Sequence, residues 1–173
     1  GVYCYPEFTE KGTSLAIETT LRNETLKPAR MQVVQELIDP TGKVVGKTQA
    51  TVEVAGQEKR TAKGAIKVAK PQLWSIDSPI LYSLKTTVTS NGKVVDASVV
   101  KTGFRKLTFD PNKGFALNDK WMKMKGVCFH HDAGVLGAEV YKDVWRRRFM
   151  QLKEIGVNAV RTSHNPQASI IYE

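Results

Sequence analysis

Cysteine and long apolar segments are scarce in this sequence. Its 173 residues include two cysteines, Cys4 and Cys128, and neither has the CxxC or CxxH spacing of a zinc or redox motif. We therefore expect two buried free thiols, and the redox compartment stays open. No apolar run reaches about 18 residues, and no basic and apolar leader is present, so no membrane span is predicted. Because the chain opens at Gly1, we expect a cut or processed start and a soluble protein, either cytoplasmic or periplasmic or secreted with its signal removed.

Acidic residues are fewer than basic ones, and the net charge is +9. Residues 1–101 carry 14 Lys and Arg against 10 Asp and Glu, and residues 102–173 carry 12 against 7. The excess is therefore spread along the chain. The one dense run, Arg146-Arg147-Arg148, lies in a predicted helix, where consecutive side chains point about 100° apart. We expect it to be a solvated helix face, and no nucleic-acid partner is predicted.

Alternation of apolar and polar residues in the first part of the chain predicts half-buried antiparallel strands. Three sets of alternating positions are Leu15, Ile17, Thr19 and Leu21; Met31, Val33, Gln35 and Leu37; and Tyr82, Leu84, Thr86 and Val88. Turn residues separate about seven predicted strands, near residues 2–8, 13–22, 30–38, 43–54, 58–69, 80–89 and 93–102. The chain is thus predicted to be mainly β, with an immunoglobulin-like β-sandwich domain over residues 1–102.

A second domain is predicted over residues 103–173, where the periodicity changes. It opens with a hairpin between residues 109 and 125 whose turn is Asn118-Asp119. Trp121, in this hairpin, and Trp145, in the helix that follows it, could serve as sugar-stacking platforms, but core packing is the preferred interpretation of both.

A strand–helix–strand pattern follows the hairpin. Its parts are a strand at 125–129, apolar residues at helical spacing from Val140 to Ile155, Gly156 as the residue after the helix, and a strand at 157–160. Such a βαβ unit requires a parallel sheet. We expect a second helix to begin near Gln167, so this domain is predicted to be a partial β/α segment, the start of an incomplete TIM barrel.

All three histidines of the chain, His130, His131 and His164, follow the two predicted barrel strands. Because the carboxyl ends of parallel strands meet at one rim, we expect His130, Arg161 and His164 to lie together. Imidazole and guanidinium groups there suit a hydroxyl-rich or anionic ligand. Two other interpretations remain: histidines that only pack or bond the loop backbone, and a zinc site made by His130, Asp132 and His164.

Several motifs in this order resemble glycoside hydrolase family 2, the family of β-galactosidases and β-glucuronidases. They are Gly103-Phe104-Arg105, Gly114-Phe115-Ala116-Leu117-Asn118, Gly126-Val127 with His130-His131-Asp132, Leu136-Gly137-Ala138, and the run from Asn158 to Pro166. The earlier residues Leu73-Trp74-Ser75, Ser78-Pro79 and Leu81-Tyr82 are similar to the sandwich domain of that family. The resemblance implies a sugar-binding jelly-roll domain, this sandwich and a (β/α)8 barrel, with the sandwich and the opening of the barrel present here.

The resemblance also implies roles for individual residues. His130, Arg161 and His164 would bind the sugar and stabilise its transition state, supported by His131, Asp132, Asn158 and Ser163. His131 and Asp132 are expected to hold the loop, with Asp132 as a partner for an imidazole N–H. The implied substrate is a β-galactoside or a related β-glycoside. No metal ligand or cofactor is assigned to these residues, while the complete enzyme would use Mg²⁺ or Na⁺.

Three positions depart from the family pattern. Cys128 and Phe129 stand where the best-known β-galactosidases hold Asn and Arg, so the polar rim is reduced and the sugar preference stays open. Asp119 stands where the family usually has Gly, and a non-Gly residue at positive φ costs about 1 kcal/mol.

Retaining glycoside hydrolysis requires two carboxyl groups about 5–5.5 Å apart. Asp132 is the one acidic residue beside a predicted strand end, because Asp143 and Glu154 lie on the helix. We therefore assign no catalytic residue and expect a fragment without activity of its own. The alternative is a stand-alone sandwich module that binds carbohydrate or protein. Because the uncovered sheet edges and apolar helix surface of an unfinished barrel favour association, we expect homo-oligomers.

Overall fold

The computed structural model describes residues 1–172 and divides into two compact units. The first unit comprises residues 1–108 with 117–119, and the second comprises residues 109–116 with the chain from Lys120 onward. The strands are β1 (Val2–Thr9), β2 (Gly12–Arg22), β3 (Ala29–Ile38), β4 (Val44–Val54), β5 (Lys59–Val68), β6 (Tyr82–Ser90), β7 (Lys93–Thr102), β8 (Leu107–Asp110), β9 (Gly114–Leu117), β10 (Lys120–Met122), β11 (Gly126–Phe129) and β12 (Ala159–Thr162). The helices are α1 (Lys142–Glu154) and the short 3₁₀ helices η1 (Gly134–Leu136) and η2 (Ser169–Ile171).

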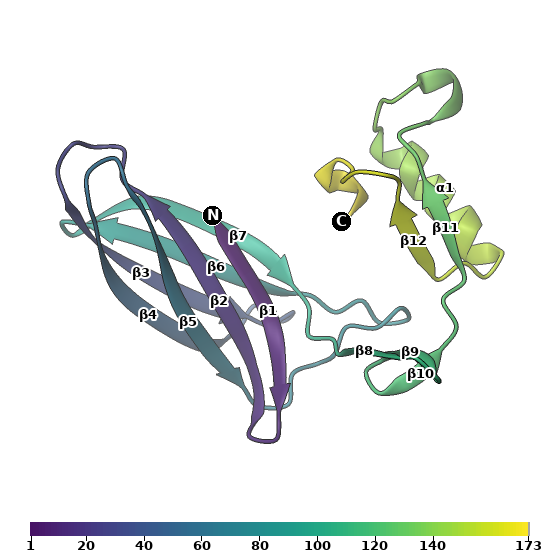
Figure 1. Cartoon of the computed structure of the whole chain (residues 1–173), viewed down its shortest axis with the longest axis horizontal. Helices are drawn as coiled ribbons and strands as arrows, with labels where there is room; N and C mark the ends of the chain where they lie inside the picture. Colours follow the sequence, from purple (N-terminus) through teal and green to yellow (C-terminus); the bar gives the residue numbers. More distant parts are fainter. Residues whose placement is uncertain (173) are drawn as a thin grey trace. The chain divides into compact units, whose positions relative to one another are not determined.

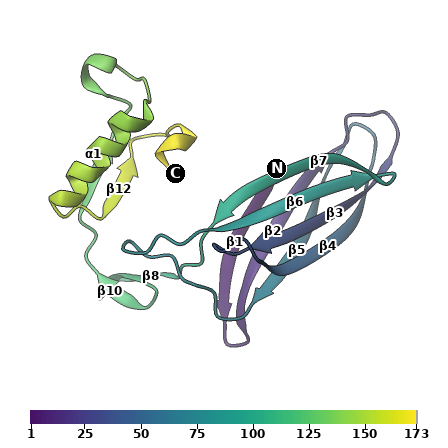
Figure 2. The same ribbon diagram turned by 180° about the vertical axis from the view of Figure 1, so that it is seen from behind.

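Seven strands of the first unit form two sheets, which Figures 1 and 2 show from opposite sides. One sheet has the order β1-β2-β5 and the other β4-β3-β6-β7, and neighbouring strands run antiparallel. This is the arrangement of an immunoglobulin-like sandwich. The predicted strands are confirmed, with small differences at their ends.

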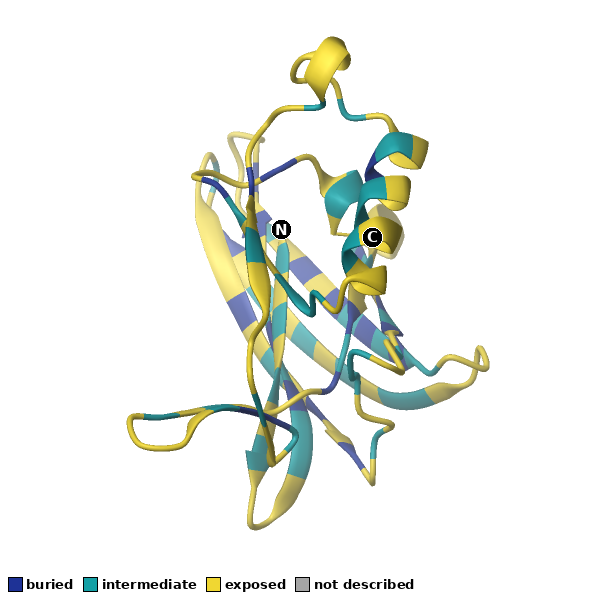
Figure 3. Cartoon of the chain, turned by 90° about the vertical axis from the view of Figure 1, so that its right-hand side faces the viewer, coloured by how far each residue is buried: buried dark blue, intermediate teal, exposed yellow. Residues whose placement is uncertain are grey.

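The core of the sandwich is made by the alternating residues. All twelve positions of the three predicted sets are buried, and Figure 3 shows buried and exposed residues taking turns along the strands. Because side chains of a pleated strand alternate between its faces, each sheet turns one apolar side inward. A polar bond is enclosed there as well, since the buried Gln35 Nε2 on β3 donates to Thr19 Oγ1 on β2 at 2.9 Å.

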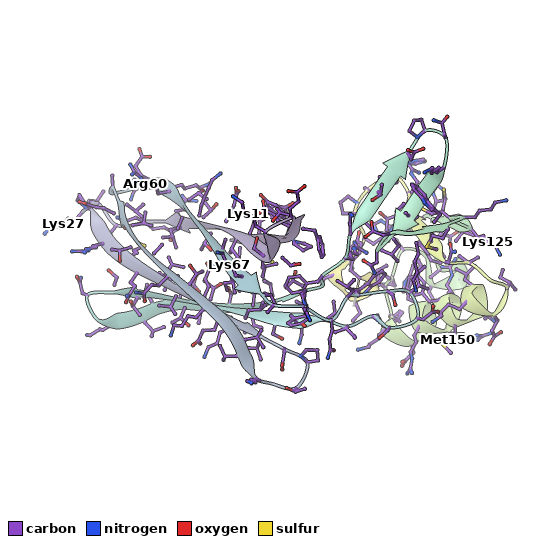
Figure 4. The ribbon with its side chains drawn as sticks, turned by 90° about the horizontal axis from the view of Figure 1, so that it is seen from below. Lys11, Lys27, Arg60, Lys67, Lys125 and Met150 are labelled. Atoms are coloured by element: carbon purple, nitrogen blue, oxygen red, sulfur yellow. The ribbon has the colours of Figure 1, made fainter. Side chains whose placement is uncertain are left out.

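Basic side chains of the sandwich lie in more than one place. Figure 4 shows Lys27 and Arg60 at one end of the sandwich and Lys11 and Lys67 towards the other. None of the helices within residues 1–172 is both long and apolar enough to cross a membrane.

A small sheet with the order β10-β9-β8 follows the sandwich. Asn118 and Asp119 form the turn between β9 and β10 with φ values of 51° and 64°, so the predicted turn and the positive φ of Asp119 are both found. The Asn118 side chain holds this turn: its Oδ1 accepts the Lys106 N–H and its Nδ2 donates to the Trp74 carbonyl, each at 3.0 Å. The expected core packing of Trp121 is wrong, because its side chain is 46% exposed and lies beside the Lys113 ammonium.

Strands β11 and β12 pair in parallel, and α1 connects them, as the βαβ pattern predicts. Trp145 of α1 is 2% exposed and packs edge-on against Phe129 of β11, with ring centres 5.2 Å apart. Its predicted core role is therefore confirmed. Gly156 follows the helix with φ 85°, a conformation that favours glycine. The helix expected near Gln167 is wrong as stated, because the structure shows only the short η2 there.

Candidate functional site

The two histidine-bearing segments begin where β11 and β12 end. Phe129 and Thr162 are opposite each other in the parallel register, so His130 and Ser163 both leave the sheet at the same level. The peptide bond between Ser163 and His164 is cis. The two strands therefore deliver His130 and His164 to one edge, as expected for the carboxyl ends of barrel strands.

His130, Arg161 and His164 form one cluster. The rings of His130 and His164 meet edge to face, with centres 5.4 Å apart and planes at 82°. Arg161 Nη1 lies 3.3 Å from His164 Nδ1. Because a guanidinium has no acceptor, the bond requires Nδ1 to accept, which leaves the proton of a neutral ring on Nε2. The cluster thus holds an imidazole N–H and a guanidinium, both exposed and both able to donate to a ligand oxygen.

Ser163 holds this cluster through two hydrogen bonds, one from its side chain and one from its backbone. Its side chain is 3% exposed, and its Oγ accepts a hydrogen bond from Arg161 Nη1 at 3.0 Å. Its backbone N–H donates to the Phe129 carbonyl at 2.6 Å, which extends the pairing of β11 and β12 by one step. Ser163 therefore orients the guanidinium and ties the His164 segment to β11.

The loop that carries His130 and His131 is held by Asp132, but not in the predicted manner. Asp132 Oδ1 accepts the backbone N–H of Gly134 at 2.7 Å, and the Asp132 N–H donates to the His130 carbonyl at 2.8 Å. The expected bond from an imidazole N–H to Asp132 is not found among residues 1–172, where its carboxylate accepts the Gly134 N–H. His131 is exposed in the same loop.

Asn158, which is expected to support the cluster, lies at the other end of the strands. It precedes β12, where its Oδ1 accepts the Lys125 N–H at 2.8 Å and its Nδ2 donates to the Lys123 carbonyl at 3.0 Å. The side chain joins the two segments that lead into β11 and β12. Its support for His130 and His164 is therefore indirect.

Arg148 differs from the solvated helix face that was predicted for the three arginines of α1. Arg146 and Arg147 are exposed, as expected for a solvated helix face, but Arg148 is only partly exposed. Its guanidinium carbon lies 4.6 Å from the Trp145 ring centre and 5.3 Å from that of Phe129. The sequence contains a pattern that indicates this position. Residues three apart share a helix face, and Arg148 follows the buried Trp145 by three.

Cys128 is exposed, so its expected burial is wrong, whereas Cys4 is partly buried. Cys128 lies opposite Arg161 in the parallel register. The Ser163 hydroxyl, followed by the Arg161 guanidinium, lowers the pKa of the Cys128 thiol below its ordinary value. Burial has the opposite effect at Cys4 and raises the pKa of its thiol.

This difference predicts selective alkylation of Cys128. A lower thiol pKa gives more thiolate at neutral pH, and the thiolate is the reactive form. In the folded chain we expect iodoacetamide to modify Cys128 before Cys4, with the rate of Cys128 rising at a lower pH. Peptide mass spectrometry over a pH series measures both rates, and Cys128→Ser isolates that of Cys4. Equal rates for the two thiols in the folded chain would contradict the expectation.

Neither of two hollows of the surface is lined by a histidine. One of about 280 Å³ runs along β11 and β12 and is lined in part by Cys128 and Arg161. A larger one of about 530 Å³ lies in the sandwich at the turn between β1 and β2. Among residues 1–172, no three His, Cys, Asp or Glu side chains gather as metal ligands would. The zinc alternative is therefore unsupported.

Comparison with known proteins agrees with the motifs. Residues 1–105 match glycosyl hydrolases family 2, and residues 111–173 match the TIM barrel domain of the same family. β-Galactosidase BoGH2A of Bacteroides ovatus is 39% identical over 159 residues, which are 92% of this chain and 19% of that protein. A β-glucuronidase of Bacteroides fragilis is 30% identical over 141 residues, 81% of this chain and 20% of that protein.

A solved structure extends the similarity to the fold. The crystal structure of a glycosyl hydrolase family 2 member from Bacteroides cellulosilyticus has a TM-score of 0.90 and 31% identity, and the match covers 99% of this chain and 24% of that one. The chain thus spans about a fifth to a quarter of the length of these relatives. The two family matches together cover the sandwich and the βαβ segment, and the chain belongs to glycosyl hydrolases family 2.

Proposed function

We propose that these residues are part of a retaining glycoside hydrolase that acts on β-galactosides or related β-glycosides. The observation that carries the proposal is the cluster of His130, His164 and Arg161 beyond the ends of adjacent parallel strands. The chain contributes one side of the sugar subsite in this proposal. The names of the B. ovatus and B. fragilis relatives support the reaction class but differ in the sugar.

The cluster has the chemistry that sugar binding requires. Hydroxyl groups of a sugar are met by directed N–H donors, which the exposed imidazole and guanidinium groups supply. Such donors become more effective when negative charge develops on an oxygen in the transition state, provided that they are already held in place. Ser163 meets that condition for Arg161 through the 3.0 Å bond to Nη1.

The cleavage itself is assigned to residues outside this chain. Retaining hydrolysis requires two carboxyl groups about 5–5.5 Å apart, one as nucleophile and one as acid and base. Within residues 1–172, Asp132 is the carboxylate next to these strand ends, and its Oδ1 already accepts the Gly134 N–H. A match of both parts of the chain to one family favours this enzyme over the alternative of a stand-alone binding module.

Activity measurements test the proposal directly. We expect the full-length protein to hydrolyse a nitrophenyl β-galactoside or a nitrophenyl β-glucuronide, and the 173-residue chain to hydrolyse neither, because residues 1–172 supply no carboxylate pair beside these strand ends. Absorbance of released nitrophenol measures both reactions under the same conditions. Turnover by the purified 173-residue chain would contradict the assignment of the carboxylates, and an inactive full-length protein would contradict the reaction class.

Self-association of the chain stays a prediction, which light scattering can measure.

A further inference from the structure

We propose that Arg148, on helix α1, is a positioning residue that holds His130 in place from both sides. The inference rests on the proposed function for its catalytic consequence, while the contacts that carry it lie within the second unit. Arg148 touches the residue before His130 and a residue two positions after it. A single guanidinium therefore spans the segment from which the imidazole projects.

The contact after His130 is a hydrogen bond. Arg148 Nη1 donates to the Asp132 carbonyl. Asp132 makes two further hydrogen bonds within the loop. Its N–H donates to the His130 carbonyl at 2.8 Å, and its carboxylate accepts the Gly134 N–H at 2.7 Å. The helix thus anchors the turn at the residue that organises it.

The contact before His130 is a cation–π contact with two aromatic rings. The guanidinium carbon lies 5.3 Å from the ring centre of Phe129 and 4.6 Å from that of Trp145. Phe129 is 6% exposed, and its carbonyl accepts the Ser163 N–H at 2.6 Å. Because Phe129 is fixed in this way, the guanidinium that contacts its ring is held in place too. The same guanidinium bonds the Asp132 carbonyl and therefore restrains the loop after His130.

Arginine is suited to this task in a way that lysine is not. A planar guanidinium can stack on a ring with its face while an N–H in its plane donates to a carbonyl. A lysine ammonium is a compact charge without that planar face. Arg148→Lys should therefore retain the charge and the fold but lose part of the positioning.

The chain offers matched controls for charge and helix propensity. Arg146 and Arg147 lie on the same helix turn, carry the same charge and are exposed. Arg147→Met removes one positive charge from α1, as Arg148→Met does. Any difference between these two variants therefore reports on the contacts of Arg148.

The first test is NMR of the histidine rings in the 173-residue chain. We expect the cross-relaxation signal between the His130 and His164 rings to be present in the unsubstituted chain and in Arg147→Met. In Arg148→Met it should be lost, and in Arg148→Lys it should be weakened while the sandwich signals stay unchanged. An unaltered signal in both Arg148 variants would overturn the proposal, even if their unfolding temperature falls.

The second test is kinetic and uses the full-length protein. Misplacing a group that acts in the transition state lowers kcat, and we expect a loss of about tenfold or more for Arg148→Met with a smaller change in KM. Arg148→Lys should recover part of kcat, and Arg147→Met should match the unsubstituted protein. Equal kcat values for Arg148→Met and Arg147→Met would overturn the catalytic consequence. The NMR test needs no substrate, so an inactive full-length protein would contradict the proposed function alone.

Discussion

Arg161→Ala in the full-length protein is expected to lower kcat/KM for its β-glycoside by about 10²–10³, the range measured when one preorganised donor to a transition state is removed. Arg161 contacts two other residues of the proposed subsite. Its Nη1 donates to the buried Ser163 Oγ at 3.0 Å and lies 3.3 Å from His164 Nδ1. The variant thus removes a donor and also releases the imidazole beside it. Most of the loss should fall on kcat, because a held donor matters most when charge develops.

Two further variants make this measurement specific. Arg161→Lys keeps the positive charge without the planar fork, so it should recover only part of the activity. Arg146→Ala removes an equally charged, exposed side chain from α1 and should leave kcat/KM unchanged. A value for Arg161→Ala within about threefold of the unsubstituted protein would remove Arg161 from the subsite, since even a single neutral hydrogen bond contributes about that much.

Trp145→Ala is expected to unfold the second unit of the 173-residue chain. Removing a buried tryptophan costs about 3–5 kcal/mol. Trp145 is 2% exposed and Phe129 is 6% exposed, and within residues 1–172 they are the two large apolar side chains of this unit that are less than a tenth exposed. A core of this size leaves little stability in reserve, because small units bury a small share of their surface.

Hydrogen exchange followed by mass spectrometry can measure the two units in the same sample. In Trp145→Ala we expect the protection of residues 126–172 to disappear while that of residues 1–102 is retained. Trp121→Ala is the matched control, because that tryptophan lies in the same unit and is 46% exposed. Its replacement should cost less than that of Trp145, because Trp121 has much less surface buried. Protection of residues 126–172 that survives in Trp145→Ala would show that the aromatic cluster is not their core.

Much of the fold follows from local patterns in the sequence. The pleat of a strand repeats every two residues, so positions such as Leu15, Ile17 and Leu84 were assigned to the interior and are buried. The parallel pair β11 and β12 was predicted from chain connectivity, because a strand, a helix and a strand in succession require it. The meeting of His130 with His164 follows from that topology and from the equal level at which the two strands end.

The residues that were misplaced depend on neighbours that a local pattern does not contain. The burial of Cys128 is decided by what lies over its strand, which the alternation of that strand alone does not indicate. Asp132 was assigned to an imidazole, yet its carboxylate bonds a backbone N–H two residues later, a short-range arrangement typical of aspartate in turns. Arg148 was grouped with its two sequence neighbours, although the spacing from Trp145 places it on the apolar side of α1.

The amide of Asn158 has a consequence for the whole βαβ segment. A slip of one residue between two strands turns every side chain to the opposite face, so the alignment of β11 with β12 must be specified somewhere. Asn158 bonds both Lys123 and Lys125 at the entrance to β11, where its side chain adds two hydrogen bonds to those that the Asn158 and Ala159 N–H groups donate to the Lys125 carbonyl. The Asn158 side chain therefore reinforces one alignment of β11 with β12, and it does so four residues of strand away from the edge where His130 and His164 meet.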